Sequence, residues 1–76
     1  MEDYKVRYKQ NGTEKVTDWL DKATAERKFK KLSNEKELIT EWAELLMYDD
    51  ATENMIVLKS FDRRAVEIFG HTMILN

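Results

Sequence analysis

Residues 21–32, DKATAERKFKKL, decide the fold, because they are the one stretch of this 76-residue chain with a clear helical pattern. Three apolar side chains recur at the i, i+4 and i+7 positions of a helix: Ala25, Phe29 and Leu32. Asp21 can accept hydrogen bonds from the first-turn amides, and Asn34 suits the left-handed position that ends many helices. We therefore predict a helix over residues 22–32, with one apolar side that needs a sheet to pack on.

A hairpin is predicted before this helix. Residues 4–9 alternate between tyrosine or valine and basic side chains, which is the period of a strand with one buried face. Asn11 and Gly12 follow, and both tolerate the positive φ of a tight hairpin turn. The return strand is expected over residues 13–19.

Two registers remain open for this hairpin. A two-residue turn forms three cross-strand pairs: Lys9–Glu14, Lys5–Asp18 and Tyr4–Trp19. A three-residue loop with a glycine bulge sets Val6 opposite Val16 instead, and turns the other face of the second strand inward. We favour the two-residue turn, because it forms two pairs of opposite charge.

Residues 34–48 carry two conflicting patterns. As a helix, they have Asn34 and Glu37 as a capping box, and an apolar stripe of Leu38, Trp42 and Leu45. As a strand, residues 42–48 set Ala43, Leu45 and Met47 on one side and Trp42, Glu44, Leu46 and Tyr48 on the other, and a polar turn follows. We favour the strand, because residues 55–61 (MIVLKSF) have a strand pattern. They would have no neighbouring strand to pair with if residues 42–48 formed a helix.

The C-terminal segment is expected to add one short element. Asp62 is placed to cap a helix over residues 63–69 that Gly70 ends, and residues 66–68 fit a strand equally well. Residues 71–76 are apolar enough to pack back onto the domain. The chain is thus expected to be one α+β domain over residues 1–76. Its four-stranded antiparallel sheet (β-β-α-β-β) has one helix on one face, and a short C-terminal helix or strand follows.

The expected third and fourth strands are apolar on both sides, whereas one helix covers one side of a sheet. In the third strand, one side carries Trp42, Leu46 and Tyr48, and the other carries Ala43, Leu45 and Met47. In the fourth, alternation sets Val57 and Phe61 against Ile56 and Leu58. The second face is therefore expected to be covered by the C-terminal segment or by another molecule.

This arrangement resembles short accessory proteins of bacteriophages and mobile elements. The resemblance is carried by the charged first strand, the Asn-Gly turn, the helix and the two later strands: residues 4–8, Asn11, Gly12, Ala25, Phe29, residues 42–50 and residues 57–61. It implies a protein that acts by binding, with a host or defence protein as the target.

The amino-acid composition indicates where the protein is located and which kinds of activity it lacks. The chain has no cysteine, no apolar run of membrane-spanning length and an acidic N-terminus, so we expect a cytoplasmic protein with no membrane association. The one histidine, His71, has no catalytic partners near it in the sequence. The acids around Asp49 lack the glycine and spacing of a calcium loop. We expect no enzyme activity, no catalytic residue, no metal, no cofactor and no small-molecule substrate.

Charge is divided along the chain and suggests two kinds of partner. Residues 1–34 carry nine basic and six acidic side chains, and residues 35–76 carry four basic and nine acidic ones. The favoured function is a protein–protein interaction or inhibitor protein. Its expected contacts are two aromatic anchors, their neighbours and the following acidic turn: Trp42, Glu44, Leu46, Tyr48, Asp49, Asp50 and Glu53.

Two alternatives remain. The first is a nucleic-acid-binding accessory protein that uses the basic side of the helix: Arg27, Lys28, Lys30 and Lys31. The second is a structural homodimer in which Trp42 and Tyr48 are buried between two copies.

Overall fold

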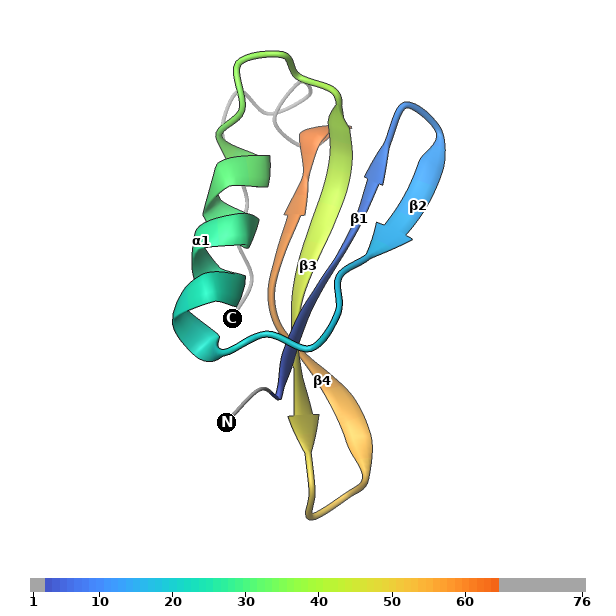
Figure 1. Cartoon of the computed structure of the whole chain (residues 1–76). Coiled ribbons are helices and arrows are strands. Elements are labelled where there is room, and N and C mark those ends of the chain that lie inside the picture. Colours follow the sequence, from blue (N-terminus) through green and yellow to red (C-terminus); the bar gives the residue numbers. More distant parts are fainter. Residues whose placement is uncertain (1–2, 65–76) are drawn as a thin grey trace.

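A computed structural model of the chain describes residues 3–64 (Figure 1). It contains five elements: β1 (Tyr4–Gln10), β2 (Thr13–Val16), α1 (Lys22–Ser33), β3 (Thr40–Asp49) and β4 (Asn54–Asp62). The strands form one sheet in the order β2-β1-β3-β4, every neighbouring pair is antiparallel, and α1 lies against one face. The predicted α+β class and β-β-α-β-β order are confirmed. The helix expected over residues 63–69 lies mostly outside the described residues, and the tail at 71–76 wholly so.

The helix begins at its predicted cap and ends differently from the prediction. Asp21 Oδ1 accepts a hydrogen bond of 2.7 Å from the Thr24 amide. Asn34 has φ −116°, so the left-handed ending expected there is wrong. Its backbone and side-chain amides instead both donate to the Lys30 carbonyl oxygen at 3.1 Å. These two bonds satisfy a carbonyl at the helix end without a left-handed residue.

The Asp21 cap gives the helix a defined sensitivity to acid. Hydrogen bonds from the Thr24 side chain, and next from its backbone amide, hold the pKa of Asp21 below its ordinary value. Since the folded-state pKa is the lower one, the cap stabilises the fold at higher pH. This stabilisation is lost as the pH falls through the folded-state pKa. Asp21→Asn keeps an acceptor at the cap, so we expect its unfolding free energy, measured in urea, to fall less between neutral and acidic pH. An unchanged pH dependence in this variant would contradict the assignment.

The first hairpin confirms the two-residue turn and corrects the rest of the register. Asn11 and Gly12 have φ of 49° and 81°, and Lys9 lies opposite Glu14 as predicted. β2 ends at Val16, however, so the expected strand over residues 13–19 and two of its pairs are wrong.

Thr17 is the physical cause of this shift in register. Its Oγ1 accepts a hydrogen bond from the Val6 amide and its own amide donates to the Val6 oxygen, both at 3.0 Å. From the Val6–Thr17 contact to the Tyr4–Leu20 bridge, this segment has one residue more than β1, which sets Leu20, instead of Trp19, opposite Tyr4. Leu20 therefore packs against the core.

A β-bulge in β4 changes which apolar residues share a face. β3 is a strand, as favoured, and its Leu45 lies opposite Lys59 while its Leu46 lies opposite Val57. Leu58 is therefore the extra residue on β4. Beyond it the alternation reverses, so Phe61 faces α1 and Val57 faces away. The prediction that placed Val57 and Phe61 on one face is wrong for this reason.

The core lies between α1 and the sheet. The predicted helix stripe is buried, and its partners come from β1, β3 and β4: Val6, Ala25, Phe29, Leu32, Ala43, Leu45 and Phe61. Phe61 is 1% exposed and lies opposite Ala43, whose small side chain leaves room for the ring. α1 packs mainly over β1 and β3.

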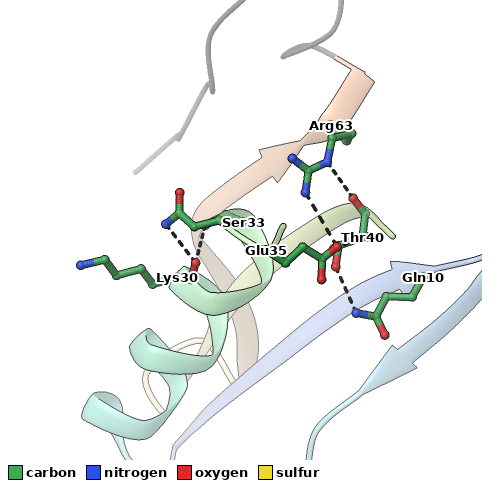
Figure 2. A network of polar contacts seen from close by, with 7 residues as sticks. Gln10, Lys30, Ser33, Glu35, Thr40 and Arg63 are labelled. Carbon is green, nitrogen blue, oxygen red and sulfur yellow. Dashed lines mark hydrogen bonds and ion pairs between the residues drawn. The ribbon is translucent and has the colours of Figure 1, made fainter. Parts of the chain in front are cut away.

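A polar network joins the loop after α1 to three strand ends (Figure 2). At its centre is Thr40, which is 0% exposed. The Thr40 amide donates to Glu35 Oε1, Gln10 Nε2 donates to Thr40 Oγ1 at 3.1 Å, and Arg63 Nε donates to the Thr40 carbonyl at 3.3 Å. Arg63 Nη2 lies 3.8 Å from Glu35 Oε1, and both side chains are largely buried. The loop is thereby tied to β1, β3 and the end of β4.

Candidate functional site

The candidate site is the sheet face turned away from α1, called the open face below, because no element among residues 3–64 covers it (Figure 1). Four predicted partner contacts lie on this face: Trp42, Glu44, Leu46 and Tyr48. They alternate along β3 with Ala43 and Leu45, which are buried under α1. The predicted alternation, which groups these four residues on one side of the strand, is confirmed.

At one end of the open face, two aromatic rings and a cation contact one another. The rings of Trp19 and Tyr48 meet edge to face, with centroids 6.1 Å apart and planes at 81°. Lys5 Nζ lies 4.4 Å from the centroid of the Trp19 ring. Such edge and cation contacts favour this arrangement of the rings. The rings of Trp19 and Tyr48 thus form an aromatic surface at this end, and Trp19 is 43% exposed.

At the other end, Arg7 joins Trp42 to Glu44. The guanidinium carbon of Arg7 lies 5.7 Å from the centroid of the Trp42 ring, and its Nε donates to Glu44 Oε1 at 2.8 Å. The Arg7 side chain is 49% exposed, so this pair orients the side chains and adds little stability. A hollow beside Trp42 is lined also by Glu44 and Ser60.

The two ends are separated by a mostly buried centre. Trp42 and Tyr48 are six residues apart on one strand, a separation of roughly 20 Å at the rise of a β-strand. Between them Leu46 is only 8% exposed, so it supports the surface more than it contributes contact area. The predicted anchors therefore belong to two separate contact points on one face.

The predicted acidic turn lies at the tip of the β3–β4 hairpin, which extends past Tyr4, the first residue of β1 (Figure 1). Asp49 is held there by its own turn, because its carboxylate accepts from the Ala51 amide at 3.2 Å and from Thr52 Oγ1 at 2.8 Å. Asp50 and Glu53 are exposed. The acids thus lie at one end of the open face, next to Tyr48, and do not form a rim around Trp42.

The basic residues of α1 do not form a single patch. Arg27, Lys30 and Lys31 are exposed on the helix. Lys28 instead places its Nζ 5.1 Å from the centroid of the Tyr8 ring on β1. The i, i+3 and i+4 spacing of Arg27, Lys30 and Lys31 on α1 places these three of the four residues named for nucleic-acid binding on one side of the helix.

Several open-face residues could not be assigned to a site from the sequence. Trp19 reaches this face through the extra residue at Thr17, and Val57 through the bulge at Leu58. Lys5 and Arg7 lie beside the aromatic rings because β1 pairs with β3. The alternation of residues 4–9 did place these two cations on one face, and it was the one feature of the sequence that could have assigned them to the site.

Among residues 3–64, no group of histidine, cysteine and carboxylate side chains is arranged to hold a metal ion. No helix in that range has the length and apolar character that crossing a bilayer requires. His71 lies outside the described residues. No family model, curated protein or solved structure matches this chain.

Proposed function

We propose that this protein binds another protein through the open face, with Trp42 and Tyr48 as anchors. The observation that carries the proposal is the pair of prearranged aromatic contact points, Arg7–Trp42 and Lys5–Trp19–Tyr48, on a face that no described element covers. Aromatic and arginine side chains dominate binding energy at protein interfaces. Side chains already held in place lose less conformational entropy on binding.

Charge layout supports an oriented encounter with the partner. Between Lys36 and Lys59 the chain has no basic residue, and Asp49, Asp50 and Glu53 lie together at the hairpin tip. An acidic tip steers a partner with a basic patch so that this patch meets the end of the open face near Tyr48. The partner surface is therefore proposed to be apolar, with a basic region at one side.

The biological role proposed from this binding is inhibition in the cytoplasm, without catalysis. The resemblance to phage and mobile-element accessory proteins is the basis for naming a host or defence protein as the target. Nucleic-acid binding through α1 is the second candidate, favoured by the shared exposure of Arg27, Lys30 and Lys31.

Trp42→Ala is expected to weaken partner binding by about 2 kcal/mol or more, the threshold of an interface hot spot. The tagged protein is used to capture partners from a bacterial lysate, and the captured protein is then purified and its affinity measured. A Lys30→Glu/Lys31→Glu variant is the control, because it changes charge on α1 and leaves the open face intact. Circular dichroism checks that both variants are folded.

The two candidate functions give opposite results in this experiment. Protein binding through the open face is lost in Trp42→Ala, kept in the lysine variant and unaffected by nuclease. Nucleic-acid binding is sensitive to nuclease, falls steeply with salt and is lost in the lysine variant. A purified partner that binds Trp42→Ala as tightly as the wild type would refute the open-face proposal.

A further inference from the structure

β4 is an edge of the sheet and is the better of its two edges for pairing with another strand. Among the described residues its strand neighbour is β3 alone. It spans nine residues, whereas β2 at the other edge spans four. The outward N–H and C=O groups of an edge strand are a template for a further strand. α1 packs mainly over β1 and β3, away from this edge.

The first half of β4 lacks the features that usually prevent edge pairing. Protected edges carry charges, proline or bulges. Residues 54–58 contain no charged residue and no proline. Met55, Ile56 and Val57 are 39%, 38% and 45% exposed. The bulge and Lys59 follow only after this stretch.

We propose that β4 pairs antiparallel with β4 of a second copy, about a two-fold axis at Ile56, joining the two four-stranded sheets edge to edge. In this register Met55 lies opposite Val57 of the second copy. Directly opposed residues share a face of the sheet, so two apolar contacts form there. The contact is isologous and closes on itself, as two-fold interfaces do.

The charges at the two ends of β4 favour a second copy as the occupant. The acidic end has Asp49, Asp50 and Glu53, and the other end has Lys59 and Arg64 against Asp62, while Arg63 is paired with Glu35 of its own chain. Antiparallel pairing about Ile56 sets the acidic end of each copy beside the basic end of the other. A strand from another protein has no such built-in complementarity.

The test is the solution mass of the full chain by light scattering over a wide range of concentration. The wild type is expected to rise from the chain mass to twice that mass. Val57→Lys places like charges near the axis in both copies, so we expect self-association at least tenfold weaker. Val16→Lys is the matched control, because Val16 is also an exposed valine of an edge strand and lies on the same face.

A further variant and a second measurement complete the test of the β4–β4 contact. Trp42→Ala is expected to leave the dimer intact, which separates this inference from the proposed function. A monomeric wild type at every concentration, or equal effects of Val57→Lys and Val16→Lys, would overturn the proposal. So would a dimer lost in Trp42→Ala. In the wild type, amide hydrogen exchange in β4 is expected to slow as concentration rises while exchange in β2 does not, and unchanged exchange in β4 would also overturn it.

Discussion

Phe61→Ala is expected to lower the free energy of unfolding by about 3–5 kcal/mol, the usual cost of removing a buried aromatic ring. Phe61 is 1% exposed and is the largest of the fully buried side chains. A chain of 76 residues has a small margin of stability, near the lower end of the usual range of roughly 5–15 kcal/mol. The variant is therefore expected to be largely unfolded at room temperature. Urea unfolding followed by circular dichroism measures the loss.

Val57→Ala is the matched control on the same strand. Val57 is 45% exposed and faces away from α1, so at concentrations where the chain is a monomer its truncation is expected to cost less than about 1 kcal/mol. The comparison tests the bulge at Leu58 directly, because an unbroken strand would place Val57 and Phe61 on the same face. Similar losses in the two variants would show that β4 has no bulge.

Local patterns were sufficient to predict most elements of this fold. The helix over residues 22–32, its cap at Asp21 and the turn at Asn11 each depend on a few neighbouring residues. The strand over residues 42–48 was harder, since its helical alternative was also locally consistent. The strand was favoured because residues 55–61 need a neighbouring strand, and β3 does pair with β4.

The errors come from two single-residue interruptions of the sheet. At Thr17 a side-chain oxygen accepts the Val6 amide, and at Leu58 one strand has an extra residue. Both interruptions depend on contacts between segments that are distant in sequence or on packing under α1. The alternation of polar and apolar residues within one segment therefore does not reveal them. Each interruption reverses the alternation beyond it and exchanges the faces of later residues.

The candidate site was predictable only within one strand. The alternation along β3 correctly grouped Trp42, Glu44, Leu46 and Tyr48. The residues that hold the rings in place come from β1 and the segment after β2, and depend on β1 lying beside β3. Strand order is a property of the whole sheet. The alternation of residues within one strand does not say which strands lie side by side.

Glu35→Ala is expected to cost roughly 3 kcal/mol, the lower end of the range for breaking a buried ion pair. The exposed fractions of the Arg63 and Glu35 side chains are 13% and 11%. Arg63 Nη2 has no hydrogen-bond partner among residues 3–64, so losing Glu35 leaves its charge buried and uncompensated. The Thr40 amide also loses its acceptor in this variant. Glu37→Ala, in the same loop and exposed, is the control, with an expected cost below about 0.5 kcal/mol.

Glu35→Gln separates the two roles of the carboxylate. It keeps an oxygen for the Thr40 amide and removes the charge that faces Arg63, so its cost is expected to lie between those of Glu37→Ala and Glu35→Ala. In Glu35→Ala/Arg63→Met the unpaired charge is gone, and the double variant is expected to lose less than the sum of the two single losses. The unfolding free energies of these variants, of the single variant Arg63→Met and of the wild type are measured in urea. Additive losses would mean that Glu35 acts through Thr40 alone, and that the ion pair does not couple the loop to the end of β4.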